Sequence, residues 1–381
     1  MNFIRMVDLS RQLEPIKAEI DAAIQGVLEA SNYIQGEPVR EFERNLAEWV
    51  GVKYVISCAN GTDALQLAFM ALGLKPGDEI IVPTFTYVAT AEVIALLGLS
   101  PILVDVDSQT FNIDIEAASH FVTSRTKAIV PVHLYGQCAN MEQIMKFAES
   151  HNLYVIEDTA QAIGAEIKFS DGSTRKAGTI GQIGTTSFFP SKNLGCFGDG
   201  GAIFTNDDSI AAKLKMIANH GQRIKYYHDV VGVNSRLDTI QAAILGVKLK
   251  HLNSYCEARQ RAASYYDSAL KHVQQITIPF RSSFSTHVFH QYTIKIDEHY
   301  SRDELKSYLA EQGIPTMIYY PLPLHKQKAY LEFQREDMDY PISTLLCNSV
   351  LSLPMHTHLN PDELEYIVYH LKRFFQIEKQ V

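Results

Sequence analysis

Residues 185–192 read Thr185-Thr186-Ser187-Phe188-Phe189-Pro190-Ser191-Lys192, and a glycine-rich segment, residues 195–201, follows them. The β-branched and aromatic residues of this stretch predict a short buried strand, which places Lys192 in the loop after it. A lysine that folding buries in such a loop loses part of its charge and becomes a nucleophile. Most lysines are solvated surface residues. The apolar residues before Lys192 and the glycine-rich segment after it argue against a surface position for this lysine.

A second apolar run, Val155-Ile156-Glu157-Asp158, delivers a carboxylate into a loop upstream of Lys192. An amine and an acid placed in this way suit pyridoxal 5'-phosphate, because a lysine binds its aldehyde covalently and an acid keeps its ring nitrogen protonated. We therefore predict catalytic roles for Lys192 and Asp158. The alternative for Asp158 is the N-cap of a following helix. Gln161 would lie one turn further on and reach the phenolic oxygen of the ring, unless it is an ordinary surface residue.

Short apolar strands alternate with helices along most of the chain. The expected strands are residues 54–57, 79–83, 101–104, 128–132, 154–156, 185–189 and 201–205; the expected helices include residues 11–31, 38–50, 63–72, 89–97, 141–150 and 208–218. This alternation predicts the α/β class, with a mostly parallel seven-stranded sheet between helices. Ligands of such sheets bind beyond the carboxyl ends of the strands, where Asp158 and Lys192 would meet.

The 381 residues are enough for two domains. A long helical stretch runs from residue 238 to about residue 271, and short strands and helices follow it near residues 291–296 and 303–312. We therefore predict a large cofactor-binding domain over residues 1–250 and a smaller C-terminal α+β domain over residues 251–381.

A phosphate group requires backbone amides and small residues at the start of a helix, and Asn60-Gly61-Thr62-Asp63-Ala64 supplies them directly after the first strand. Many strand-to-helix turns contain such residues simply to turn the chain. We predict phosphate binding here because Ser187 and Lys192 are also present. Ser187 would add a hydroxyl donor. Tyr87, in the loop after the second strand, would stack on the pyridine ring, although aromatic residues in such loops often belong to the core.

Composition excludes several classes of protein. The formal net charge of −9 gives no general attraction for nucleic acid or anionic lipid. Five scattered cysteines predict reduced thiols in a cytoplasm, and the 14 histidines have no metal-ligand spacing. Residues 1–8 lack the pattern of a signal peptide, and no apolar run has membrane-spanning length. We predict a cytoplasmic protein with no metal, no nucleic-acid partner and no membrane partner.

Two local clusters predict an anionic substrate such as a nucleotide sugar. Residues 220–238 combine cations and aromatic rings before a helix, and residues 319–326 read Tyr319-Tyr320-Pro321-Leu322-Pro323-Leu324-His325-Lys326. The second cluster would close the pocket from the smaller domain. A solvated loop is the alternative for the first cluster. The Gly-x-Gly-x-x-Gly fingerprint of a nicotinamide enzyme is absent from the first strand-to-helix turn.

These motifs make the chain similar, along nearly its whole length, to the DegT/DnrJ/EryC1/StrS family of sugar aminotransferases, which are fold-type-I pyridoxal phosphate enzymes. The motifs are residues 60–65, 157–161, 187–192 and 234–238, in the order and approximate spacing of the family. The resemblance implies that Lys192 is the Schiff-base lysine and that Asp158 holds the pyridine nitrogen. Family dehydratases have a histidine in place of the lysine, so Lys192 points to transamination.

The resemblance also assigns the remaining cofactor contacts. Gln161 meets the phenolic oxygen, and Tyr87 stacks on the ring. The family's homodimer implies that the phosphate is bound by residues of both subunits: Gly61, Thr62 and Ser187 from one, and Asn234 from the other.

Residues 56–62, 134–138 and 231–236 most resemble the members that move an amino group from glutamate to carbon 3 of UDP-2-acetamido-2-deoxy-3-oxo-glucuronate. In those members the residues matching Arg236, Tyr319 and Tyr320 line the substrate site, with a histidine usual at the position of Tyr319. Because tyrosine carries no positive charge, Arg236 or Lys326 would have to bind a uronate carboxylate.

The expected activity is therefore transfer of the amino group of L-glutamate to a UDP-linked 3-keto sugar, with 2-oxoglutarate as the second product, for surface polysaccharide such as O-antigen. One alternative keeps the chemistry and changes the substrate to a dTDP-3-keto-6-deoxyhexose or a UDP-4-keto sugar. Another is a regulatory protein that binds the sugar or the cofactor without catalysis.

Overall fold

A seven-stranded sheet forms the centre of the molecule in the computed structural model, which describes residues 4–334 and 339–376. Its strand order is β1-β9-β8-β5-β4-β2-β3. The strands are β1 (Tyr54–Cys58), β2 (Glu79–Pro83), β3 (Ser100–Val104), β4 (Thr126–Ile129), β5 (Tyr154–Asp158), β8 (Ile183–Ser187) and β9 (Gly201–Thr205). Only β9 runs against its neighbours, and the other pairs are parallel. The predicted α/β fold with a mostly parallel sheet is confirmed.

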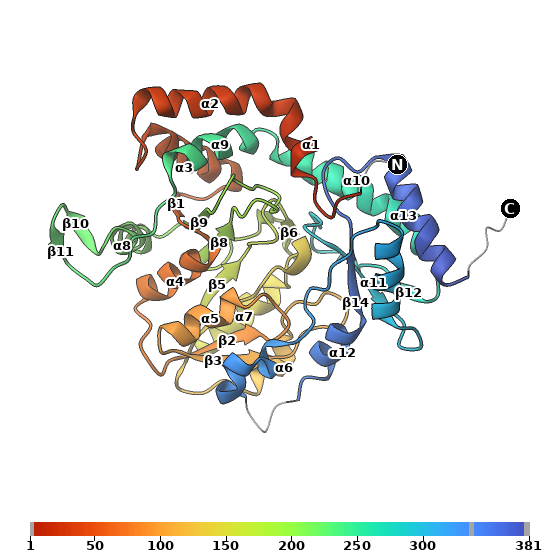
Figure 1. Ribbon diagram of the computed structural model, residues 1–381. Coiled ribbons are helices and arrows are strands. Elements are labelled where there is room, and N and C mark those ends of the chain that lie inside the picture. The colour runs from red at the N-terminus through yellow and green to blue at the C-terminus, as the bar shows by residue number, and fades with distance from the viewer. Residues whose placement is uncertain (1–3, 335–338, 377–381) are drawn as a thin grey trace.

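Helices cover both faces of this sheet (Figure 1). One face packs on α3 (Glu37–Val50), α7 (Met141–His151) and α9 (Thr239–Leu249); the other packs on α4 (Gly61–Leu72), α5 (Ala89–Leu96) and α8 (Asp208–Ala218). Successive strand residues alternate between the two cores, as Val155 and Ile156 do. Because both faces are buried, the strands read as continuous apolar runs, which is why the sequence located them.

The structure differs from the sequence predictions in several places. The expected helix over residues 11–31 is interrupted by a 3-10 turn at Glu14–Ile16, and β4 begins two residues and ends three residues before the expected strand. The long helical stretch is two helices, since α9 ends at Leu249 and α10 (Leu252–Leu270) begins after a two-residue turn. A polar hairpin, β6 (Glu166–Lys168) and β7 (Thr174–Lys176), was not predicted because its strands are too short and too polar to give an alternating pattern. Strand β8 begins at Ile183, two residues before the expected start.

A smaller antiparallel sheet lies at the right of Figure 1 with the order β12-β13-β14. Its strands are β12 (Ile276–Thr277), β13 (Tyr292–Ile296) and β14 (Val350–Leu353), and its helices are α10, α11 (Arg302–Glu311) and α13 (Pro361–Phe374). These elements share one apolar core. The segment η3 (Leu324–Lys326), η4 (Lys328–Phe333) and α12 (Pro341–Ser349) packs instead on residues of the large sheet. A domain division at residue 250 stays a prediction.

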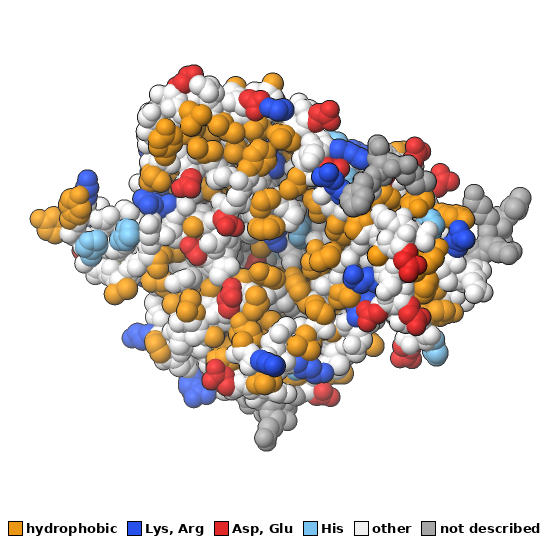
Figure 2. Space-filling model, viewed as in Figure 1, with side chains coloured by type: hydrophobic (Ala, Val, Ile, Leu, Met, Phe, Trp, Pro, Cys, Tyr) orange, Lys and Arg blue, Asp and Glu red, His pale blue; other side chains and the backbone are white. Residues whose placement is uncertain are grey.

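The remaining elements are short, apart from α2, and belong to neither of the two sheets described above. They are α1 (Leu9–Leu13), η1 (Glu14–Ile16), α2 (Lys17–Ala30), α6 (Ile115–Ser119), η2 (Leu134–Gly136), β10 (Gln222–Ile224) and β11 (Tyr227–His228). The β10-β11 hairpin projects from the left of the molecule in Figure 1, and Figure 2 shows hydrophobic side chains at its tip. Tyr226 is 77% exposed and Val231 is 87% exposed. The hairpin and the residues after it therefore expose apolar side chains to solvent.

Within the described residues, every helix is too short or too polar to cross a bilayer.

Candidate active site

The carboxyl ends of β1, β2, β4, β5 and β8 meet at one edge of the large sheet, because these strands run in the same direction. The loops that begin there carry the predicted cofactor residues. Gly61 follows β1, Tyr87 follows β2, Asp158 ends β5, and Lys192 follows β8. The fold therefore brings together residues that are up to 131 positions apart in the sequence.

Asp158 is 6% exposed and its carboxylate is held on two sides. The hydroxyl of Thr90, in the first turn of α5, donates a hydrogen bond of 2.9 Å to Oδ2, and the amide of Ala160 donates one of 3.1 Å to Oδ1. No basic side chain of the described residues lies within 4.0 Å of this carboxylate. Residues 160–163 form a turn and not a helix, so the N-cap alternative for Asp158 is wrong.

Glu157 anchors the end of β5 from the other face of the sheet. Its fully buried carboxylate accepts hydrogen bonds from the amides of Gly178, Ile180 and Gly181 and from Nε2 of His133. The amide of Ala139 donates to Nδ1 of His133, which assigns the ring proton to Nε2. Because neighbouring strand residues point to opposite faces, this anchor directs Asp158 toward the candidate site.

Lys192 is half-buried in the loop after β8. Burial lowers the pKa of its amine to about 8, and the negative charge of Asp158 acts in the opposite direction. No hydrogen bond joins this amine to another described residue, whereas the side chain of the next residue, Asn193, donates to the carbonyl of Val288 at 3.1 Å. The loop is thus fixed while the amine stays free to react.

Gly61 and Ser187 form a close contact where α4 begins. A Cβ at Gly61 would lie 2.7 Å from Cβ of Ser187, so only glycine fits. Asn60 caps the helix by accepting from the amide of Asp63 at 2.8 Å. The described residues offer no acceptor for the amides of Gly61 and Thr62. This is the cradle of small residues, free amides and a hydroxyl that a phosphate group requires.

Aromatic and amide side chains border the site on the side of residues 319–320. The amide of Gln161 donates to the hydroxyl of Tyr320 at 3.0 Å, and its oxygen accepts from the backbone of Tyr135 at 2.8 Å. The ring of Tyr87, 56% exposed, lies 6.3 Å from that of Tyr320. The hydroxyl of Tyr135 donates to the carbonyl of Tyr319. One wall of the candidate site is therefore formed by Tyr87, Gln161 and Tyr320. The side chain of Gln161 already makes two hydrogen bonds, one through its amide nitrogen and one through its oxygen.

Two buried residues of the candidate site were not predicted from the sequence. The first is Thr90, which donates to Asp158. The second is His290, which is 5% exposed and has an Nδ1 without a partner among the described residues. Burial, with the charges of Lys192 and Arg259, holds the pKa of His290 well below its usual value. Neither residue lies in a motif with a recognisable spacing, so only the folded structure identifies them.

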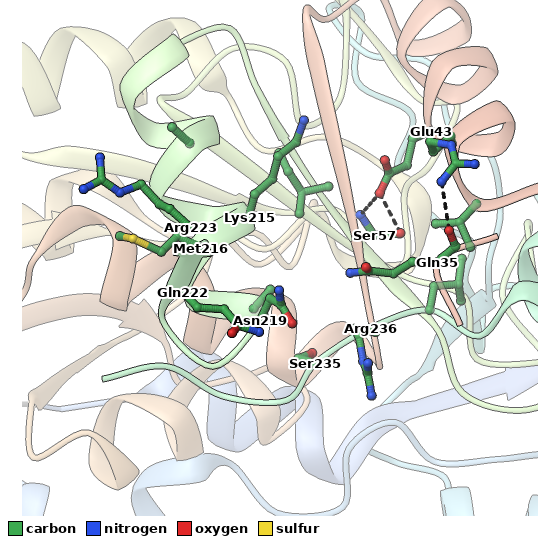
Figure 3. A pocket seen from close by; sticks show the side chains of 16 residues that line it. Gln35, Glu43, Ser57, Lys215, Met216, Asn219, Gln222, Arg223, Ser235 and Arg236 are labelled. Carbon is green, nitrogen blue, oxygen red and sulfur yellow. Dashed lines mark hydrogen bonds between the residues drawn. The ribbon is translucent and has the colours of Figure 1, made fainter. Parts of the chain in front are cut away.

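No described contact joins Asn234 or Arg236 to Lys192 or Asp158. Arg236 lines a separate cavity of about 510 Å³ (Figure 3). The residue between them, Ser235, accepts a hydrogen bond of 3.1 Å from the amide of Ala59, just after β1. The polar side chains that line this cavity include Gln35, Arg40, Glu43, Ser57, Lys215, Asn219, Gln222 and Arg223. The lining includes four cations and the carboxylate of Glu43, but Arg40 is paired with Glu37 and Arg223 with Asp229, which leaves Lys215 and Arg236 as the cations without an ion pair among the described residues. Asn234 itself is exposed.

Lys326 lies on the surface, where its amine donates to the hydroxyl of Thr344 in α12 at 3.2 Å. The neighbouring His325 is buried and exchanges hydrogen bonds with Thr84, the first residue after β2. The structure thus ties Lys326 to α12, and its role in substrate binding stays a prediction.

The residues at the sheet edge fit pyridoxal phosphate. This cofactor requires three groups, and the structure supplies each of them. They are a buried carboxylate that can accept a further hydrogen bond, an amine without a partner whose pKa is lowered, and a helix N-terminus packed against a serine. The residues that would hold it are Lys192, Asp158, Gly61, Thr62 and Ser187.

Comparison with known proteins agrees with this geometry. The chain is 48% identical to the UDP-2-acetamido-2-deoxy-3-oxo-D-glucuronate aminotransferase of Pseudomonas aeruginosa, over 96% of this chain and 98% of that protein. It is 44% identical to a pleiotropic regulatory protein of Geobacillus stearothermophilus, over 98% and 99% of the two chains. The solved structure of NtdA from Bacillus subtilis, with bound cofactor PMP, matches with a TM-score of 0.90 and 30% identity, over 99% of this chain and 86% of that one.

The model of the DegT/DnrJ/EryC1/StrS aminotransferase family matches residues 14–372. The expected resemblance, cofactor and enzyme class are thereby confirmed, and the chain belongs to this family of pyridoxal phosphate-dependent sugar aminotransferases.

Proposed function

We propose that this enzyme moves the amino group of L-glutamate to carbon 3 of a UDP-linked 3-keto sugar, UDP-2-acetamido-2-deoxy-3-oxo-glucuronate, and releases 2-oxoglutarate. The observation that carries the aminotransferase chemistry is the convergence of Lys192, Asp158 and the Gly61–Ser187 contact at one edge of the sheet. The 48% identity with the P. aeruginosa enzyme supports this choice of sugar.

Each of these residues would have a distinct task. When bound, pyridoxal phosphate supplies an electron sink for the carbon that gains or loses the amino group. The amine of Lys192 would hold the cofactor and then carry the proton between that carbon and the cofactor. A pKa of about 8 lets this amine accept and release protons near neutral pH. Asp158 would keep the ring nitrogen protonated, and Gly61, Thr62 and Ser187 would hold the phosphate.

We propose that the complete site requires a homodimer in which Asn234 and Arg236 serve the active site of the partner subunit. No contact joins either residue to Lys192 in the described chain, and neither side chain has a hydrogen bond with a described residue. The exposed β10-β11 hairpin beside them offers an apolar surface for a second copy. Arg236 would meet the sugar carboxylate, since Lys326 is engaged with Thr344.

The experiment that tests the substrate is turnover by the purified protein, with glutamate as donor, on three keto-sugar nucleotides. The proposal expects the highest kcat/KM for UDP-2-acetamido-2-deoxy-3-oxo-glucuronate, measured as release of 2-oxoglutarate. A higher value for a dTDP-3-keto-6-deoxyhexose or a UDP-4-keto sugar would replace this substrate and keep the chemistry. These alternatives are tested because this chain has Tyr319 at a position where the members that act on the proposed sugar usually have a histidine.

A regulatory protein without catalysis is the competing proposal from another class, and the relative in G. stearothermophilus gives it support. The intact set of Lys192, Asp158 and Ser187 favours catalysis. The visible absorption of the cofactor decides between the two, because an aminotransferase changes it on addition of glutamate alone. A spectrum that no amino donor changes would favour the regulatory protein.

We further propose that the reaction takes place in the cytoplasm and supplies an amino sugar for surface polysaccharide such as O-antigen. The five cysteines all have buried free thiols, as expected in a reducing compartment. Loss of the surface polysaccharide on deletion of the gene, restored by the wild-type chain and not by the Lys192→Ala variant, would support this role.

A further inference from the structure

Thr90 and Asp158 form a buried contact between a hydroxyl and a carboxylate. Oγ1 of Thr90 lies 2.9 Å from Oδ2 of Asp158, across 68 positions of the sequence. Thr90 is 1% exposed and Asp158 is 6% exposed, so bulk water does not compete for this hydrogen bond. An ionised carboxylate can only accept, which makes the threonine hydroxyl the donor.

The carboxylate keeps acceptor capacity on the side of the site. Each of its oxygens has two lone pairs, and the described residues use one on Oδ2, for Thr90, and one on Oδ1, for the amide of Ala160. No basic side chain within 4.0 Å neutralises it in the described part of the chain. A single strong donor, such as a ring N–H, can therefore still bind.

We propose that Thr90 is a positioning residue that orients Asp158 and stabilises its ionised form, so that a proton shared with the pyridine nitrogen of the cofactor stays on the nitrogen. This inference rests on the proposed function, which assigns Asp158 to that nitrogen. A hydrogen bond donated to the charged form of an acid favours that form. Because the contact is charge-assisted, losing it shifts the proton toward Asp158 by about tenfold.

The position of Thr90 suits this task. It lies in the first turn of α5, where the positive end of the helix dipole also favours a carboxylate. The other ionisable groups that face Asp158 are the amine of Lys192 and the phenol of Tyr320. Neither group forms a hydrogen bond or an ion pair with Asp158, so Thr90 is the only described side chain that fixes the orientation of its carboxylate.

Two substitutions separate hydrogen bonding from packing. Thr90→Val keeps the branched shape and removes the donor, whereas Thr90→Ser keeps the donor and removes a methyl group. If the hydrogen bond matters, valine is the more harmful residue; if packing matters, serine is. Thr90→Ala also lacks the donor and adds no apolar surface, so it replaces the valine variant should that variant fail to fold.

The readout is the ¹⁵N chemical shift of the ring nitrogen in holoenzyme loaded with cofactor labelled at that atom, together with kcat for glutamate. Thr90→Val should move the shift toward the unprotonated value and lower kcat about tenfold, with Thr90→Ser within about twofold of wild type. An unchanged shift in Thr90→Val, or an equal change in Thr90→Ser, would overturn the inference.

Asp158→Asn is the reference variant, since it removes the acid itself. A large change in the shift with Asp158→Asn and none with Thr90→Val would reject the role of Thr90 alone. No change with Asp158→Asn would reject the assignment of Asp158 and, with it, this part of the proposed function.

Discussion

Asp158 and Arg236 belong to the same predicted site, yet their surroundings are opposite. Asp158 is 6% exposed and accepts two hydrogen bonds, and its neighbour Glu157 accepts four more on the other face of the sheet. Arg236 is half-buried beside an open cavity and makes no hydrogen bond or ion pair with a described residue. The first group is held by hydrogen bonds within its own chain, whereas the second has no hydrogen bond or ion pair with a described residue.

This difference separates two physical tasks. Groups that act on the cofactor must be held within a fraction of an ångström, which buried hydrogen bonds achieve. Groups that meet a substrate or a second subunit must stay accessible until that partner arrives. We infer that the sheet edge at Lys192 is preorganised, whereas the surface around Arg236 and the β10-β11 hairpin is completed by assembly.

The largest effect is expected from the preorganised part. Lys192→Ala should lower kcat at least about 1,000-fold, because the variant lacks the amine that moves the proton. Cofactor should still bind through Asp158 and the Gly61–Ser187 cradle, measured by fluorescence titration. Lys213→Ala, an exposed lysine on α8, serves as the matched control and should retain activity. Turnover near the wild-type rate in Lys192→Ala would place the chemistry elsewhere.

The second prediction uses mixed dimers to test whether Arg236 acts in the active site that contains Lys192 of the other subunit. Lys192→Ala and Arg236→Ala should each be inactive alone when assayed with the sugar nucleotide. If Arg236 serves the partner's site, hybrids formed by co-expression contain one intact site, and random pairing restores about a quarter of the wild-type sites. If Arg236 acts within its own chain, no hybrid has an intact site and mixing restores nothing.

The sequence was most informative where the chain is buried on both sides. The apolar runs at residues 154–156 and 185–189 predicted strands, and the shared edge of a parallel sheet then predicted that the loops after them meet. The structure confirms the fold, with β5 and β8 adjacent. Local residue types and one topological rule were enough to group Lys192, Asp158, Gly61 and Ser187.

The sequence was least informative where the signal is not local. Thr90 contacts Asp158 from a helix 68 positions away, and nothing in its neighbourhood marks it. The turn between α9 and α10 contains neither glycine nor proline, so two helices read as one. Sequence alone also gave no sign that Arg236 lies apart from Lys192 within one chain; the family resemblance supplied the second subunit.

The third prediction concerns the assembly surface. Ile224→Asp places a charge on the β10-β11 hairpin, where the native side chain is 68% exposed. If a second copy covers this hairpin, the dimer dissociation constant should rise about 100-fold, measured by analytical ultracentrifugation, and activity should fall at low protein concentration. Leu96→Asp is the control, since Leu96 is 72% exposed at the end of α5, near the opposite edge of the sheet. Equal effects of both changes would show no special role for the hairpin.

The smallest effect tests whether the preorganised part costs stability. In the cofactor-free protein, burial lowers the pKa of Lys192 from 10.5 to about 8, so the unfolded chain binds a proton more readily than the folded chain between these values. The free energy of unfolding of the wild type should therefore rise with pH between about pH 8 and pH 10.5. Below about pH 8 the buried amine is charged, and its full destabilising effect should be present. Lys192→Met removes the charge and should stabilise the protein by about 1 kcal/mol at pH 7, a value reduced by partial exposure to water, with less gain at pH 10. Urea unfolding at both pH values measures this, with Lys213→Met as the surface control. A gain that does not depend on pH would indicate better packing of methionine and not the removal of a buried charge.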